Sequence, residues 1–271
     1  MDKQLLEQLF KGIVPGLSKV LEDPQYSRSL VLRLRQIFAN DKTEGVSIIT
    51  CTNRPHFMNN IFANYENQFH AIKELIIILN RDDMDLDVWK MKAENYPNVS
   101  IYKVPQDKTI GECQNFAVEK TKYEYIATFD DDDYYAPNYI SDLMLAFKYT
   151  DADIVGKSSY FCYIQGLQAL VLRNPANEFQ YVDFVGGGKR IVKKSVFDVV
   201  KFPPLSNQED RIFCIESIKK GFKIFSADNY NLCYLRSSNQ NHHTWSISDE
   251  EMLARCSLVT YTNDYKPFVT L

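Results

Sequence analysis

Between Gly45 and Phe129 the sequence alternates short, almost wholly apolar runs with segments of helical spacing. A strand this apolar is buried on both faces, which is the environment of a parallel sheet covered by helices. The alternation therefore predicts an α/β domain built on a mostly parallel sheet, and such sheets bind ligands beyond the carboxyl ends of their strands. The four predicted strands are VSIIT (Val46–Thr50), ELIIIL (Glu74–Leu79), VSIYKV (Val99–Val104) and YIATF (Tyr125–Phe129).

The second half of the chain has a less regular pattern. A helix is predicted from about Glu209 to Lys220, because Gly221 is a typical residue at the end of a helix. The glycine cluster Gly186–Gly188 precedes it. The predicted strands of this half are Ser158–Ile164, Leu167–Leu172, Tyr181–Val185, KIFSA and NLCYL.

Residues 1–43 are predicted to form a helical extension in front of the main domain, residues 44–271. Apolar residues recur at helical spacing over Leu5–Leu21, Pro24 ends this first helix, and Ser27 is the expected cap of a second one. We expect the extension to pack on the main domain or on a second copy of the chain, which would make a homodimer. The alternative is a helix on a membrane surface, but its lysines are mixed with acids, whereas such helices usually have a cationic face.

The composition excludes several classes of protein. The 271 residues carry a formal net charge of −4, so no overall basic charge recruits nucleic acid. Six scattered cysteines without CxxC spacing indicate reduced thiols and a cytosolic protein. The first ten residues lack the apolar core of a signal peptide, and no run approaches the ~20 apolar residues that span a bilayer. We expect a cytoplasmic location, with a peripheral position at the inner face of the membrane left open.

Four consecutive aspartates, Asp130–Asp133, follow directly on the fourth predicted strand. Carboxylates this close repel one another, so some are protonated or a cation lies among them. If the strand geometry continues, Asp130 and Asp132 point to the same side. Two hard oxygen donors on one face suit Mg²⁺ or Mn²⁺, with a diphosphate completing the shell. The alternative is a solvated acidic turn before the next helix, where acids favour the helix dipole.

Together these segments resemble family 2 glycosyltransferases of the GT-A fold. The resemblance rests on VSIITCTNRP, ELIIIL, TIGECQNFAVEKTKYEYIATFDDDDYYAPNYI and NQEDRIF, and it covers roughly residues 45–245. It implies a Rossmann-like, mixed but mostly parallel sheet with helices on both faces, here with an N-terminal helical extension. The overall character is similar to bacterial enzymes that make surface or spore-coat polysaccharide.

The resemblance implies an inverting transfer of a sugar from a UDP-, dTDP- or GDP-linked donor to a hydroxyl of a sugar or glycan acceptor. Asp130-Asp131-Asp132 matches the family's DxD motif. By that match Asp130 and Asp131 would contact the donor, and Asp132 would hold Mn²⁺ or Mg²⁺. The other donor-binding residues that the resemblance implies are Thr50, Thr52, Arg54, Asn80 and Asn115.

Asp210 matches the family's catalytic base, and direct in-line attack needs one base to take the proton of the acceptor hydroxyl. The late histidine that many GT-A enzymes bring to the metal or diphosphate corresponds to His243, or to the adjacent His242. The acceptor-side candidates are Glu209, Gly187 and Trp245. The alternatives are an acidic helix N-terminus for Glu209-Asp210, a tight turn for the glycines and an exposed loop for the histidines.

The sequence departs from the family pattern at three places. Leu79-Asn80 stands where the family usually has two aspartates, Thr52 where an aromatic is common, and Gln114 where Arg is common. These changes leave undecided which nucleobase the donor carries. They do not involve the residues expected to hold the metal or Asp210, the expected catalytic base. One rival is a degenerate GT-A protein that acts as a nucleotide-binding or scaffold module. The other is a sugar-phosphate nucleotidyltransferase, but TCTNRP stands where those enzymes have a glycine-rich loop.

Overall fold

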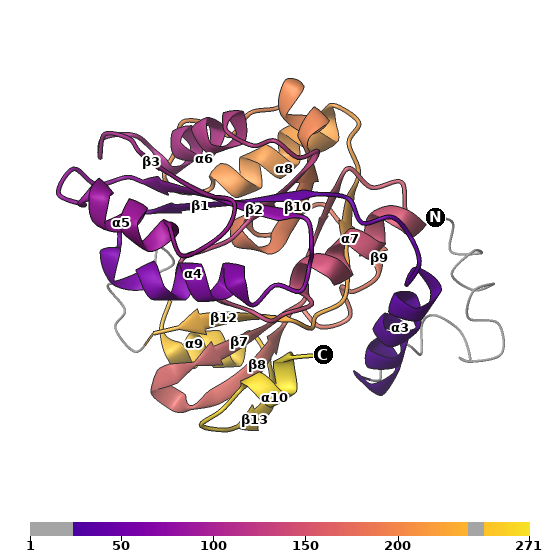
Figure 1. The fold of residues 1–271 in the computed structure, drawn as a ribbon. Helices are drawn as coiled ribbons and strands as arrows, with labels where there is room; N and C mark the ends of the chain where they lie inside the picture. The colour runs from indigo at the N-terminus through magenta and orange to yellow at the C-terminus, as the bar shows by residue number, and fades with distance from the viewer. Residues whose placement is uncertain (1–23, 238–246) are drawn as a thin grey trace.

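The structure, a computed structural model, describes residues 24–237 and 247–271. Its centre is an eight-stranded sheet in the order β3-β2-β1-β4-β10-β6-β11-β9 (Figure 1). The strands β3, β2, β1 and β4 are parallel to one another, and so are β6 and β11, whereas β10 and β9 run antiparallel to their neighbours. In chain order the strands are β1 (Val46–Thr52), β2 (Lys73–Leu79), β3 (Val99–Lys103), β4 (Tyr125–Thr128), β6 (Ile154–Gly156), β9 (Gln180–Tyr181), β10 (Arg190–Lys193) and β11 (Ile224–Ser226).

Helices cover both faces of this sheet, as the apolar strands predict. Alternate side chains of β1 point to opposite faces, so Ile48 joins one apolar core and Ile49 joins the other. The helices α6 (Ile110–Glu119) and α8 (Glu209–Lys219) pack on the Ile49 side. The helices of the Ile48 side are α3 (Pro24–Ile37), α4 (Met58–Glu66), α5 (Leu86–Ala93) and α7 (Tyr139–Tyr149).

The strand β10 lies in the middle of the sheet and was not predicted. It pairs antiparallel with β4 on one side and β6 on the other, and its Ile191 and Val192 are fully buried. Its four residues RIVK have no alternation long enough to be recognised in the sequence, so its strand character comes from the two neighbours that enclose it. The predicted strand Tyr181–Val185 is wrong over most of its length, because only Gln180–Tyr181 pairs, at the edge of the sheet.

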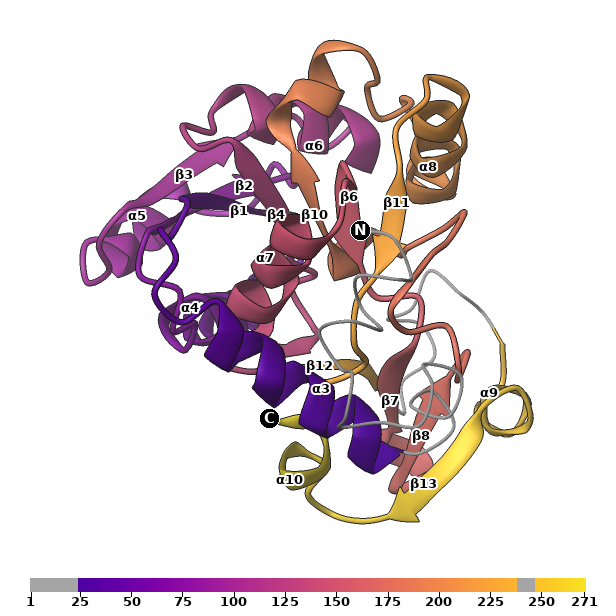
Figure 2. The same cartoon turned by 90° about the vertical axis from the view of Figure 1, so that its right-hand side faces the viewer.

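A second, five-stranded sheet in the order β13-β8-β7-β12-β5 lies beside the main one (Figure 2). Its edge strand β5 follows Asp130–Asp133 directly in the chain, so the second sheet begins where the aspartates end. The elements of this part are β5 (Tyr134–Tyr135), β7 (Tyr160–Ile164), β8 (Ala169–Arg173), β12 (Leu232–Arg236), α9 (Asp249–Ala254), β13 (Ser257–Tyr261) and α10 (Lys266–Val269).

The second predicted helix of the N-terminal extension is present as α3, but it begins at Pro24. Ser27 is therefore a buried residue inside the helix and not its cap. The helix is held to α7 by Arg35, whose Nε and Nη2 each donate to Asp142 at 2.8 Å. The first predicted helix lies outside the described residues, and a homodimer through the extension stays a prediction. Every helix in residues 24–237 and 247–271 is too short or too polar to cross a lipid bilayer.

The start of α6 depends on a glycine. A Cβ atom on Gly111 would lie 1.9 Å from the carbonyl oxygen of Pro203, and the Gly111 N–H donates to Leu205 O at 3.1 Å. We expect Gly111→Ala to lower the free energy of unfolding by about 1–3 kcal/mol, because backbone and not a flexible side chain must move. Urea unfolding measures this, with the exposed Glu119→Ala of the same helix as the control. Equal stability of the two variants would contradict the packing of α6 against residues 202–205.

Candidate active site

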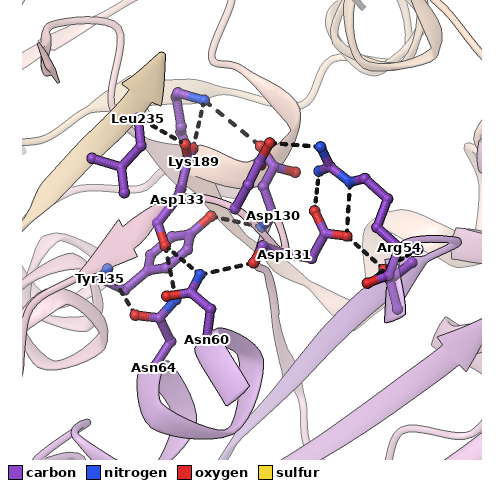
Figure 3. A network of polar contacts seen from close by, with 11 residues as sticks. Arg54, Asn60, Asn64, Asp130, Asp131, Asp133, Tyr135, Lys189 and Leu235 are labelled. Carbon is purple, nitrogen blue, oxygen red and sulfur yellow. Dashed lines mark hydrogen bonds and ion pairs between the residues drawn. The ribbon is translucent and has the colours of Figure 1, made fainter. Parts of the chain in front are cut away.

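The four aspartates Asp130–Asp133, called the acidic run below, form a loop at the carboxyl end of β4, at the edge where sheets of this kind bind ligands. Two asparagines of α4 hold the backbone of this loop. Asn60 Nδ2 donates to the carbonyls of Asp131 and Asp133 at 2.7 and 3.1 Å, and Asn64 Nδ2 donates to the Asp133 carbonyl at 2.9 Å (Figure 3). Hydrogen bonds from these two side chains therefore hold the loop in place, although it lies outside the strand β4.

The carboxylates of Asp131 and Asp132 share one cationic partner, Arg54. Arg54 Nε donates to Asp131 Oδ2 at 3.1 Å, Nη2 contacts Asp131 Oδ1, and Nη1 lies 2.8 Å from Asp132 Oδ2. Thr52 Oγ1 also donates to Asp131 Oδ2, at 2.5 Å. Burial raises the pKa of Asp131, and Arg54 opposes that shift. Burial alone would lower the pKa of Arg54, but the two carboxylates raise it above its usual value, so the guanidinium stays charged.

The carboxylates of Asp130 and Asp133 meet a second cation, Lys189. Lys189 Nζ lies 3.5 Å from Asp133 Oδ2 and 3.8 Å from Asp130 Oδ2, and it is enclosed between the rings of Tyr160 and Tyr234 at 5.1 and 5.2 Å. Asp133 is fully buried and also accepts the Leu235 N–H at 3.1 Å. Burial raises the pKa of Asp133, while Lys189 counteracts it.

The predicted alternation within the acidic run requires that the strand continue, and it does not, because β4 ends at Thr128. The acids are instead grouped as Asp131 with Asp132 and Asp130 with Asp133. The two members of the DxD match nevertheless keep exposed surface: the Asp130 side chain is 44% exposed and Asp132 is 16% exposed. Asp131 and Asp133, at 5% and 0%, are buried. Two of the four carboxylates are thus accessible to a ligand.

The surroundings of Asp130 bring it close to the predicted base. Its backbone N–H donates to Tyr135 Oη at 2.7 Å, and Tyr135 Oη donates to Gly188 O at 2.7 Å. A Cβ on Gly188 would lie only 2.2 Å from Asp130 Oδ2, so glycine is required for this approach. The partly enclosed surroundings raise the pKa of Asp130, although Lys189 opposes them, and nearby acids raise it further.

The pair Glu209-Asp210 stands at the start of α8 and faces the same glycine turn. The Gly187 N–H donates to Asp210 Oδ2 at 3.2 Å, and the Arg211 N–H donates to Asp210 Oδ1 at 2.7 Å. Burial raises the pKa of Glu209, with a further contribution from Asp210. The structure thus brings Asp210, Glu209, Gly187 and the acidic run together, although about eighty residues separate the two acidic segments in the sequence.

The remaining donor-binding candidates, Thr50, Asn80 and Asn115, differ in whether their side chains are already hydrogen-bonded within the protein. Thr50 is buried within β1, and its hydroxyl has no hydrogen-bond partner among the described residues. The Asn80 N–H donates to Thr52 O at 2.9 Å, which places Asn80 beside the end of β1, while its side-chain amide donates to Pro105 O at 2.8 Å. The side chain of Asn115 is engaged elsewhere, because it exchanges hydrogen bonds of 2.9 and 3.0 Å with the backbone of Phe202.

His243 and Trp245, the other two candidates, lie outside the described residues. Within residues 24–237 and 247–271 no group of three or more His, Cys, Asp or Glu side chains is arranged to hold a metal ion. A metal at this site would therefore rely on one or two carboxylates of the acidic run and on ligands from elsewhere.

Sequence reasoning missed Lys189 and the two asparagines of α4. A signal for Lys189 was present, because a cation that follows Gly186–Gly188 and precedes an apolar run is a candidate partner for buried acids. Asn60 and Asn64, in MNNIFANYE, have helical spacing and no feature that links them to a loop about seventy residues away.

We expect Lys189→Met to lower the free energy of unfolding by about 3 kcal/mol, because Asp133 is left buried without its counter-charge. Burial holds the folded-state pKa of Asp133 at about 8 even with Lys189 present, and loss of Lys189 raises it further above its unfolded value. Stability of the variant therefore continues to fall above about pH 8, so the difference from wild type should be larger at about pH 9 than at about pH 7. Urea unfolding at both pH values measures this. Lys189→Met/Asp133→Asn should recover most of the loss; a double variant no more stable than the single one would contradict the pairing.

Comparisons with known proteins identify the fold and the family. By fold, the chain is similar to S. aureus TarS residues 1–349 in complex with UDP-GlcNAc (TM-score 0.58, 15% identity), covering 76% of this chain and 63% of that one, which is under two thirds. It is also similar to the mannosyltransferase PcManGT from Pyrobaculum calidifontis in complex with GDP-Man and Mn²⁺ (TM-score 0.58, 13% identity), covering 83% and 69%. A sequence comparison with curated proteins finds no significant match. The model of Glycosyl transferase family 2 matches residues 47–200, more than half of the chain, and the protein therefore belongs to that family with a GT-A fold.

Proposed function

We propose that the protein is a metal-dependent, inverting glycosyltransferase that moves a sugar from a nucleoside-diphosphate sugar to an acceptor hydroxyl. One observation carries the proposal. Asp130 and Asp210 lie against adjacent residues of one glycine turn, Asp130 against Gly188 and Asp210 against Gly187. A single displacement needs a group that binds the donor and a base that takes the acceptor proton within one sugar's reach. The position of the two carboxylates against one glycine turn, without intervening side chains, supports the proposal.

We propose the class of donor from what the structural neighbours bind. The TarS structure holds UDP-GlcNAc, and the PcManGT structure holds GDP-Man with Mn²⁺. Since the present chain shares their fold, a nucleoside-diphosphate sugar is the donor that we propose, with the base (uridine, thymidine or guanosine) left to experiment. The process, synthesis of surface polysaccharide or of a glycoconjugate, is proposed on the sequence resemblance alone.

The acidic run suits a divalent cation by its chemistry. Its hard carboxylate oxygens are the ligands that Mg²⁺ and Mn²⁺ prefer. Four carboxyl groups face only two cations, Arg54 and Lys189, so the cations of the chain do not match the acids one to one. Asp132 and Asp130 would hold the ion, since they are the two members that keep exposed surface. When bound, such an ion neutralises charge that develops on the departing diphosphate.

The residues of the chain itself account for the proton transfer. Two backbone N–H groups orient the Asp210 carboxylate, one on each oxygen, so that it is held toward the glycine turn. From there it takes the proton of the acceptor hydroxyl as that oxygen attacks the sugar. Glu209, beside it, would accept a hydrogen bond from the acceptor or donate one when protonated, which the raised pKa of this residue favours.

A second candidate function is nucleotide binding without transfer. It is favoured by the end of β2, where Leu79 is fully buried and the Asn80 amide is bonded to Pro105. Neither Leu79 nor Asn80 has a carboxylate, although the family usually has two aspartates at this place. Binding of a nucleotide sugar with metal present, without hydrolysis or transfer, would support this candidate.

We expect Asp210→Asn to lower kcat about 10²–10⁴-fold, because an amide cannot take the acceptor proton. Nucleotide binding should stay near the wild-type value, since Asn keeps the acceptor oxygen for the Gly187 N–H. Transfer or donor hydrolysis is measured beside isothermal titration with the nucleotide. Glu216→Gln, exposed on the same helix, is the matched control. Near-normal turnover in Asp210→Asn would remove this residue from the mechanism.

A thermal-shift screen of UDP, dTDP and GDP, each with and without Mn²⁺, tests the donor class. A ligand that binds only the folded state stabilises it by about 2.7 kcal/mol at one hundred times its Kd. We expect one nucleotide to raise the melting temperature only when Mn²⁺ is present, and Asp132→Asn to abolish that shift. The exposed Asp198→Asn should behave like wild type. Shifts that are the same with and without Mn²⁺ would argue against a metal-dependent donor site.

A further inference from the structure

Arg54 has a position that its sequence assignment as a donor-binding residue does not explain. Its guanidinium spans two carboxylates, with Nε and Nη2 on Asp131 (Figure 3) and Nη1 2.8 Å from Asp132 Oδ2. The plane also lies over the Phe57 ring, 4.6 Å from its centre. Asp132, a partly exposed carboxylate that is proposed to hold a divalent cation, is thus already bound by a cation of the chain.

The two cations of the site differ in how firmly they are enclosed. Lys189 is 9% exposed and lies between two carboxylates and two tyrosine rings, so it is a permanent counter-charge. Arg54 is 26% exposed, and its Asp132 contact is made by one terminal nitrogen. Because the guanidinium is a rigid plane, the contact is released when the Asp132 side chain turns away from Nη1 while Nε and Nη2 remain on Asp131, and this change needs no movement of the backbone.

The backbone at Arg54 is itself held in place. The Arg54 N–H donates to Thr52 Oγ1 at 3.0 Å, and Thr52 Oγ1 donates in turn to Asp131. A released guanidinium nitrogen therefore stays at the carboxyl end of β1, beside the acidic run. Guanidinium groups bind phosphate oxygens with paired hydrogen bonds, so a diphosphate at this edge is a suitable new partner.

We propose that Arg54 is an exchangeable internal cation: it neutralises Asp132 when no donor is bound, and it transfers that contact to the diphosphate when a divalent cation takes Asp132. The inference rests on the proposed metal-dependent donor site and deepens it. A divalent ion alone must displace Arg54 without giving it a new partner, and a nucleotide alone must compete with Asp132 for Arg54. Each ligand therefore binds weakly alone and tightly with the other, and the coupling is the same in both directions.

The test is the Mn²⁺ dissociation constant, measured by electron paramagnetic resonance of free Mn²⁺ with and without a nucleoside diphosphate (UDP and GDP in separate series). We expect Arg54→Met to bind Mn²⁺ alone about tenfold more tightly than wild type, and to show a smaller gain when nucleotide is added. Arg54→Lys keeps the charge but not the fork that reaches two carboxylates, so its Mn²⁺ affinity should lie between the two. Arg33→Met, exposed on α3, controls for the change in net charge and should match wild type.

The outcomes separate this inference from the proposed function. If wild type binds Mn²⁺ with nucleotide, but Arg54→Met binds Mn²⁺ alone no more tightly than wild type, the metal site stands and the exchange is overturned. If no protein binds Mn²⁺ even with nucleotide present, the metal-dependent function fails and the exchange with it. Melting curves are recorded for each variant; if Arg54→Met does not fold, Arg54→Lys decides, and an Mn²⁺ affinity equal to that of wild type then overturns the exchange.

Discussion

The concentration of negative charge at the end of β4 is the constraint on which the rest of the site depends. Four adjacent carboxylates cannot all lie at the edge of a low-dielectric sheet without counter-charges. The fold supplies Arg54 from the end of β1 and Lys189 from the turn before β10, and each takes two of the acids. The two cations come from opposite sides of β4, so together they fix the conformation of the acidic run. Asp130 and Asp132 are the two acids that keep exposed surface.

The same interactions connect the two sheets. Asp133 accepts the Leu235 N–H of β12, so the acidic run is tied to the second sheet as well as to the first. Tyr135, in β5, joins the Asp130 N–H to the Gly188 carbonyl and stacks on Phe129, with ring centres 3.8 Å apart. Placement of the carboxylates is thus a property of the packing between sheets, and the β4 strand by itself does not determine it.

Local patterns in the sequence were sufficient for the first half of the fold. The runs of β1, β2 and β4 are apolar because both faces are covered, and helices separate the first four strands, so period and length identify each element, including the partly exposed edge strand β3. The patterns failed for β10 and β13. Arg190–Lys193 is too short to show a period, and Ser257–Tyr261 is largely exposed, so both are strands only because a partner strand supplies their hydrogen bonds.

By itself the sequence determined which side chains are available and where along the chain they stand: carboxylates directly after a buried strand, glycines before a cation, and a second acidic pair at a helix start. These are local facts, set by residue type and by the periods of strand and helix. Only the tertiary structure decided the partners. The grouping of the acids, the enclosure of Lys189 and the approach of Asp210 to Gly187 join residues that are 23 to 79 positions apart, as in Gly187 with Asp210 and Thr52 with Asp131. Such contacts form when packed layers close long loops, and no local pattern records which loops will meet.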